Sequence, residues 1–132
     1  MAKKIQADDA EFRSEALASA LEAQDTAAVA FALRNDRVVV PMLPVEGPPQ
    51  VRVFRRGDAD KYMLLLFSSA ENYVRMVPQE SDHRVLTYGP EGLREFLEQN
   101  LGVLEAVWFD VAGPHAMQAT PQDVLDALTL EA

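Results

Sequence analysis

The chain has 132 residues, the length of one ordinary domain, which leaves little room for a second independent core. Hydrophobic residues make up 48% of it, a normal share for a globular domain, and the absence of cysteine excludes disulfides, thiolate catalysis and cysteine-ligated metal sites. The net charge of −9 disfavours binding to nucleic acid or to an anionic membrane surface.

The negative charge is concentrated near the end of the sequence. No Lys or Arg follows Arg94, whereas seven carboxylates do: Glu95, Glu98, Glu105, Asp110, Asp123, Asp126 and Glu131. Such a charge run usually keeps a protein soluble. The alternative is a basic partner protein that docks on this acidic half.

The sequence shows no export or membrane signal. Lys3 and Lys4 are basic, but acidic residues follow where an apolar region would have to begin. The longest apolar runs, 27–33 and 62–67, are far shorter than the roughly 18 residues that a membrane helix needs. We therefore expect a cytoplasmic protein with no membrane contact.

Two helices are expected first. Asp8 is a candidate N-cap with Glu11 three residues on, and apolar residues at helical spacing carry this helix to about Ala23. Asp25 is a candidate cap for a second helix over 26–34. Because that segment is apolar all round, we expect the second helix to be buried.

The periodicity then changes to that of strands. Residues 37–43 contain three successive β-branched valines and are bounded by Pro41 and Pro44, a combination typical of an edge strand or of strand pairing that ends early. A hairpin follows, with a strand over 51–53, a turn over 56–60 and a returning strand over 61–67. The returning strand has no polar face, so we expect it to be central and covered on both sides.

Helices and strands alternate in the next segment. Ser68 and Glu71 have the spacing of a capping box, with Ser68 as the cap, and they open a helix that stops at Pro78. A polar loop leads to a short strand over 84–88. Two elements of different type thus lie within twenty residues, which favours a mixed α/β arrangement.

The remaining elements continue this alternation. Pro90 is well placed in the first turn of a helix that Gly102 is expected to cap at its C-terminus. A second strongly apolar strand covers 104–111. Residues 120–123 form another capping box, which opens the last helix.

These elements predict a single α+β domain. Its sheet is mixed, with about five strands and antiparallel edges, and helices pack on both faces. We expect residues 1–7 to form a flexible tail and residues 8–132 to form the domain. No internal repeat or linker divides it.

No motif indicates a metal, a nucleotide or another cofactor. The only imidazoles are His83 and His115, and neither has a partner at metal-ligand spacing. The glycine motifs that hold phosphates are absent. We expect no cofactor, no metal and no catalytic residue.

One group of polar residues is a candidate pocket. If the two most apolar strands run parallel, four side chains gather at their carboxyl ends, where open α/β folds bind ligands: Ser68, Ser69, Asp110 and His115. Asp110 is unusual because it is a carboxylate in an otherwise apolar strand. In the structural alternative, the serines cap a helix, and Asp110 faces outward or caps the next turn. A hydrolase would normally show a G-x-S-x-G elbow, which is absent.

A second surface is basic. Four residues flank the expected hairpin, namely Arg52, Arg55, Arg56 and Lys61. They could contact an acidic partner or the acidic half of a second copy, or they could form an ordinary solvated hairpin. A small sheet with short edges can pair with its own copy, so a homodimer is a further expectation.

Several segments together resemble the SseB family, specifically its N-terminal domain. They are VVVP at 38–41, KYMLLLFSSAENY at 61–73, YGPEGLREFLEQN at 88–100, AVWFDVAGP at 106–114 and TPQDVLDAL at 120–128. The resemblance covers roughly residues 26–130 and implies a bacterial, mostly non-enzymatic α/β domain with no family catalytic residues. The chain departs from the family pattern after the last strand, where Asp110 and Val111 replace an Asn-Pro step.

The leading hypothesis is a non-catalytic protein–protein interaction or adaptor module whose partner is unknown. The basis of this hypothesis is a core large enough for a stable fold, well-formed helix caps, and no group of residues in the sequence that is arranged for catalysis. The alternative is a small-ligand-binding domain, or less readily a hydrolase, at the sheet edge near Ser68, Asp110 and His115. That alternative predicts a concave pocket into which Asp110 points.

Overall fold

The computed structural model of the chain describes residues 12–129. Its elements, in chain order, are α2 (Glu15–Ala23), α3 (Thr26–Asn35), β1 (Val38–Met42), β2 (Tyr62–Leu66), α4 (Ala70–Met76), β3 (Arg84–Tyr88), α5 (Pro90–Asn100), the 3-10 helix η1 (Leu101–Val103), β4 (Leu104–Phe109), β5 (Met117–Ala119) and α6 (Pro121–Thr129). The tail expected over 1–7 and the cap expected at Asp8 lie outside the described residues.

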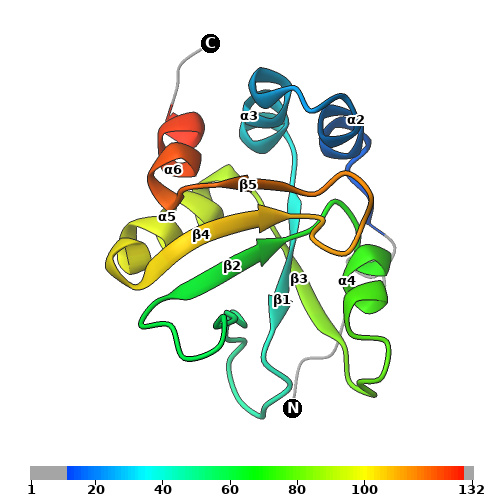
Figure 1. Cartoon of the computed structure of the whole chain (residues 1–132), viewed down its shortest axis with the longest axis vertical. Helices are drawn as coiled ribbons and strands as arrows, with labels where there is room; N and C mark the ends of the chain where they lie inside the picture. Colours follow the sequence, from blue (N-terminus) through cyan, green and yellow to red (C-terminus); the bar gives the residue numbers. More distant parts are fainter. Residues whose placement is uncertain (1–11, 130–132) are drawn as a thin grey trace.

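The strands form two small sheets (Figure 1). β1 pairs with β3 antiparallel, while β2 and β4 run parallel and β5 lies antiparallel to β4. Val39 and Phe67 exchange two backbone hydrogen bonds, with N–O distances of 2.9 and 3.0 Å, where β1 crosses the end of β2. The α+β class with mixed strand pairing is confirmed. The expected single sheet is divided in two because β1 crosses β2 too steeply for a longer ladder.

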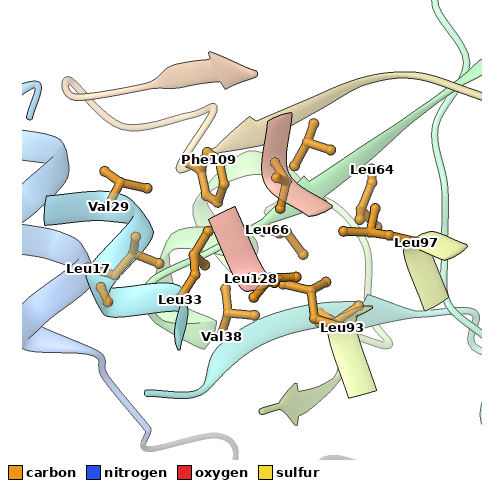
Figure 2. Close-up of a cluster of buried hydrophobic side chains, with 14 of the residues drawn as sticks. Leu17, Val29, Leu33, Val38, Leu64, Leu66, Leu93, Leu97, Phe109 and Leu128 are labelled. Carbon is orange, nitrogen blue, oxygen red and sulfur yellow. The ribbon is translucent and has the colours of Figure 1, made fainter. Parts of the chain in front are cut away.

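The side chains of β2 alternate between two hydrophobic clusters. Leu64 and Leu66 belong to the larger cluster, which also contains side chains of α2, α3, α5 and α6 (Figure 2). Leu65 and Phe67 belong to the smaller cluster, together with Tyr73 of α4. The expectation that this strand is covered on both sides is confirmed. The expectation that it is central is wrong, because β4 is the middle strand of this sheet and β2 lies at its edge, where only isolated bridges join it to other segments. Each fully buried leucine contributes about 1.5–3 kcal/mol to the stability of the fold.

The start of α2 differs from the expectation. Its N-cap is Ser14, whose hydroxyl oxygen accepts a hydrogen bond from the Leu17 backbone N–H at 3.2 Å. Arg13, immediately before it, makes an isolated antiparallel bridge to Ser69 and is therefore not helical. The Ser14 hydroxyl also donates to Asp36 Oδ2 at 2.7 Å, so a contact with the end of α3 fixes where α2 begins.

The helix α3 is capped as predicted but is buried on one side only. Asp25 accepts a hydrogen bond from the Ala28 backbone N–H at 3.1 Å. Val29 and Leu33 enter the core, whereas Phe31 is 57% exposed. The expectation of a fully buried helix is wrong because α3 packs in an outer layer, where only its inward stripe meets other elements.

Two features of the second half were not predicted correctly. Gly102 lies within η1 and does not cap α5, because the chain continues from α5 directly into this 3-10 turn. The strand β5 follows the loop at His115 and has three residues only. It exists because it pairs with the edge of β4, with Met117 opposite Phe109.

Candidate functional site

A buried carboxylate links the ends of the two parallel strands. Asp110, just after β4, is 7% exposed, and Ser68, just after β2, is fully buried. Asp110 Oδ1 accepts the Ser68 backbone N–H at 2.8 Å, and Oδ2 accepts the Ser68 hydroxyl at 2.7 Å. Because the register places Leu66 opposite Phe109, the chain can make both bonds without a bulge at this end. We call this pair the Ser68–Asp110 tie.

The backbone at Asp110 has an unusual conformation. Its φ of 47° lies in the left-handed region, which aspartate tolerates better than most residues. The Asp110 carbonyl oxygen accepts the Gly113 N–H at 2.9 Å, so the chain turns sharply after β4. The two side-chain bonds to Ser68 hold this turn against the end of β2.

Further hydrogen bonds converge on Ser68 from two helices. Asn72 of α4 donates its side-chain amide to the Ser68 hydroxyl oxygen at 3.2 Å. Ser14, the cap of α2, donates its backbone N–H to the Ser68 carbonyl oxygen at 2.8 Å. Among the described residues, every buried side-chain nitrogen or oxygen has a hydrogen-bond partner. Ser68 is thus a junction between two strand ends and two helices.

Ser69, rather than Ser68, caps α4. Its hydroxyl oxygen accepts the Asn72 backbone N–H at 3.3 Å. The predicted capping box is therefore wrong by one residue, and Glu71 pairs with Arg75 at 3.6 Å. Ser68 does not cap the helix because its hydroxyl is hydrogen-bonded to Asp110, and Ser69 occupies the N-cap position instead.

A polar cleft of about 280 Å³ opens beside the Ser68–Asp110 tie. Ser68, Asp110 and His115 line it, whereas Ser69 is not among the described residues that do so. Its other lining residues are Arg13, Glu15, Ala18, Ser19, Glu22, Asn72, Arg75, Gly113 and Pro114. Three of the four predicted pocket residues thus come together at one hollow.

The charges in this cleft are mixed. Arg13 and Arg75 are cations, while Glu15 and Glu22 add carboxylates to that of Asp110. The sequence did not single out these residues because they come from α4 and from the N-terminal segment through α2, far apart in the chain. The helical spacing of Asn72 and Arg75 in α4 is the one local signal that could have found two of them.

His115 stands apart from the tie. Its side chain is 45% exposed, and its Nε2 lies 3.9 Å from Glu22 Oε2. The Ser68 hydroxyl donates to Asp110 rather than to an imidazole. This order differs from a catalytic triad, in which the hydroxyl faces the imidazole and the carboxylate holds its other nitrogen. Within residues 12–129, no group of three or more metal-ligating side chains gathers.

A second polar cluster lies where the basic hairpin was expected. The predicted strand over 51–53 is wrong, because only isolated antiparallel bridges form there, between Val51 and Met42 and between Phe54 and Met63. Arg52 makes a bidentate ion pair with Glu80, with N–O distances of 2.8 and 2.9 Å, and donates to the Tyr73 hydroxyl at 2.8 Å. Its guanidinium also lies 4.7 Å from the centre of the Phe54 ring. We call these four side chains the Arg52 cluster. The guanidinium side chain is only 21% exposed, so Arg52 is engaged within the chain.

The contacts of the Arg52 cluster shift two pKa values. The hydrogen bonds from Arg52 lower the pKa of Glu80 below its usual value. Burial raises the pKa of Tyr73, and the nearby Arg52 opposes part of that rise. At neutral pH the cluster therefore holds a carboxylate, a guanidinium and a neutral phenol.

The chain matches a protein-family model. That family model, described as "SseB protein N-terminal domain", matches residues 14–126, which is most of the chain. This confirms the resemblance carried by the strand and helix segments. No curated protein and no solved structure matches the chain. In the part of the chain that the structure describes, no helix is long and apolar enough to cross a bilayer.

Proposed function

We infer that this chain, which belongs to the SseB family through its N-terminal domain, is a non-catalytic protein–protein interaction or adaptor module of the bacterial cytoplasm. One observation carries the proposal. Ser68 and Asp110 are the pocket residues best suited by type to take part in a reaction, and two hydrogen bonds join them to each other. They hold the fold together at the ends of β2 and β4.

The geometry of this tie is unfavourable for nucleophilic catalysis. A serine becomes a nucleophile when a nearby base accepts its proton, and His115 would have to be that base. The Ser68 hydroxyl is buried and donates to a carboxylate, and His115 lies near Glu22 instead. An incoming substrate would have to break the tie before the Ser68 hydroxyl could act as a nucleophile.

Partner retention is the direct test of an interaction module. The full chain, carrying a cleavable tag, is expressed in its own cells, treated with a short cross-linker and purified under denaturing conditions. We expect one or a few proteins to be retained in amounts comparable to the bait, and to be lost with a tag-only control. Purification of the chain without any partner or second copy would contradict the proposal.

The same purified chain tests the non-catalytic half of the proposal. Wild type and Asp110→Asn are compared on a panel of chromogenic acyl esters, phosphoesters and glycosides. We expect both to give the buffer rate. Turnover by wild type that Asp110→Asn abolishes would overturn it, provided that circular dichroism shows both proteins folded.

Binding of a small polar molecule is a second candidate function, and the cleft of about 280 Å³ favours it. Its lining of two arginines and several carboxylates suits a zwitterion. Saturation-transfer NMR with the twenty amino acids tests it. Binding that Arg75→Ala weakens, and that Arg94→Ala on α5 leaves unchanged, supports this function. Equal loss in both variants, or no binding, argues against it.

A further inference from the structure

An apolar groove lies on the opposite side of α3 from α2. It has a volume of about 260 Å³ and is open to solvent between α3, α6 and β5. Figure 1 shows α6 and α2 on opposite sides of α3. The lining residues of the groove are Thr26, Val29, Ala30, Leu33, Phe109, Met117, Gln118, Ala119, Asp123, Val124 and Ala127. On α3 these residues fall at i, i+3, i+4 and i+7, so they form one continuous helical stripe. We call this the α3–α6 groove.

Small side chains create the hollow. Ala30 on α3 and Ala127 on α6 stand on its two walls, and Ala119 of β5 contributes to its floor. Phe109 closes it at depth, where it is 1% exposed. A space of this volume, with an apolar lining, suits one bulky aliphatic or aromatic side chain of a partner.

The two ends of the groove differ in charge. Thr26 and Asp123, from the first turns of α3 and α6, lie together in the lining, whereas Arg34 at the end of α3 donates to the Ala127 carbonyl oxygen at 3.2 Å. The N-terminal end thus carries Asp123 and Asp25, the cap of α3, whereas Asp126 lies one turn further along α6 and is not among the lining residues. This is the acidic end of the groove.

These carboxylates are not neutralised by any residue in the part of the chain that the structure describes. Asp25, Asp123 and Asp126 are exposed, and none of them forms an ion pair with a described residue. Their hydrogen bonds go to the Ala28 backbone N–H, in the case of Asp25, and to the Gln122 amide, in the case of Asp126. An apolar hollow beside free negative charge is complementary to an apolar residue flanked by cations.

We propose that the α3–α6 groove docks a segment of a partner protein in which one bulky apolar residue is flanked by Lys or Arg. This inference deepens the proposed interaction function and rests on it. The apolar residue enters between Ala30 and Ala127, and the basic residues lie over the acidic end. On the basic surface of a second copy, Arg52 and Arg56 are already paired with Glu80 and Glu105, which leaves Arg55 and Lys61 of the four cations to meet the acidic end.

The probe is a set of fluorescein-labelled peptides, each with a central Leu, Phe or Trp. The flanking positions are Lys and Arg in one series, Gly and Ser in the second, and Asp and Glu in the third. Fluorescence polarisation with the full chain measures the affinity of each peptide. We expect the basic series to bind about tenfold more tightly than the neutral series, and the acidic series not to bind.

Two alanines of α3 provide a matched pair of variants. Ala30→Leu fills the groove from its wall, whereas Ala27→Leu adds the same side chain at an exposed position of the same helix. Ala30→Leu should weaken the basic peptides about tenfold, and Ala27→Leu should leave their affinity unchanged. Equal affinity of both variants for the basic peptides would overturn the proposal.

The charge of the acidic end is tested with a second matched pair. Asp25→Asn with Asp123→Asn removes two charges there and keeps an N-cap side chain at position 25, whereas Asp58→Asn with Asp60→Asn removes two from the turn over 56–60. Only the first pair should weaken binding and reduce its dependence on NaCl concentration. Loss of affinity in both pairs would show that overall charge drives binding and would contradict the groove.

The outcomes separate this inference from the proposed function. If cross-linking retains a partner from cells and Ala30→Leu retains it equally, the groove is not the docking site, although the chain is still an interaction module. If light scattering shows a dimer that Ala30→Leu alone disrupts, the occupant is a second copy and the proposed partner is wrong. If neither a partner nor a second copy is retained, the proposed function itself fails.

Discussion

The Ser68–Asp110 tie and the Arg52 cluster use similar chemistry in different surroundings. Both join segments distant in sequence through hydrogen bonds to a carboxylate. Ser68 is fully buried and Asp110 nearly so, whereas the Arg52 and Glu80 side chains are 21% and 31% exposed. Water can replace a lost partner in the second group but not in the first. The more deeply buried Ser68–Asp110 tie should therefore contribute more to the free energy of unfolding than the Arg52 cluster does.

The largest effect is expected for Asp110→Ala. It removes both acceptors of Ser68 and places alanine at a φ of 47°, a conformation that alanine adopts with strain. Two hydrogen bonds to a buried charged group together contribute about 3 kcal/mol. Urea unfolding followed by circular dichroism should show this loss. Asp58→Ala in the exposed hairpin turn is the control, and an equal effect there would refute the special role of Asp110.

A smaller effect is expected for Ser68→Ala. The backbone N–H of residue 68 keeps its bond to Asp110 Oδ1, while the hydroxyl bond to Oδ2 and the weaker bond from the Asn72 amide, at 3.2 Å, are lost. The free energy of unfolding should fall by about 1.5 kcal/mol, half the effect of Asp110→Ala. Ser81→Ala, at an exposed loop position, should change it by less than about 0.5 kcal/mol. A result for Ser68→Ala no larger than this control would count against the tie.

The Arg52 cluster should respond to acid with a smaller change. Hydrogen bonds from Arg52 lower the pKa of Glu80 in the folded state. Its contribution to stability is therefore complete above the unfolded pKa, near 4.3, and disappears as the pH falls through the lower folded pKa. Glu80→Gln should flatten this acid-side decline in urea unfolding measured from pH 7 to pH 2. A decline of unchanged size would contradict the pairing.

The smallest effect is expected on the alkaline side. Burial raises the folded pKa of Tyr73, so its contribution is complete below the unfolded pKa, near 10, and is lost as the pH rises through the folded value. Ultraviolet titration should show a tyrosine that ionises at a higher pH than a free tyrosine, and this signal should be absent from Tyr73→Phe. Burial also raises the pKa of Tyr88, and its late ionisation should persist in this variant. Normal ionisation of all tyrosines would contradict the structure at Tyr73.

Elements with complete local signals could be predicted from the sequence. The strand β3 has the predicted bounds, α5 begins at Pro90, and Thr120 caps α6 by accepting the Asp123 N–H at 3.0 Å. One signal is a proline in the first turn of a helix, and the other is a hydroxyl that accepts the backbone N–H three residues later. Both are contained within a single helical turn. No distant residue has to be known for such signals to be read.

Features that depend on distant contacts could not be predicted in the same way. Ser68 and Ser69 are equivalent as local caps, and only Asp110, 42 residues away from Ser68, determines which of them caps α4. Ser14 is likewise selected as a cap by its bond to Asp36. The strand β5 has too few residues to show an alternating pattern and forms against β4.

The candidate site lies between these two cases. On the condition that the two most apolar strands run parallel, Ser68 was expected at the same sheet edge as Asp110, and in the structure β2 and β4 do run parallel and the two residues are in contact. The bonds between the two side chains depend on the left-handed turn at Asp110, which no sequence pattern indicated. Proximity could therefore be predicted, but the structural use of the pair could not.

A double-mutant cycle between Ser68→Ala and Asp110→Asn measures how strongly the two side chains interact. If they hold the ends of β2 and β4 together, the loss of either one should remove most of the benefit of the other. Urea unfolding of the four proteins should give a coupling free energy of about 1.5 kcal/mol, with both single variants less stable than wild type. A coupling near zero, with Asp110→Asn as stable as wild type, would show that the pair is not maintained for the fold.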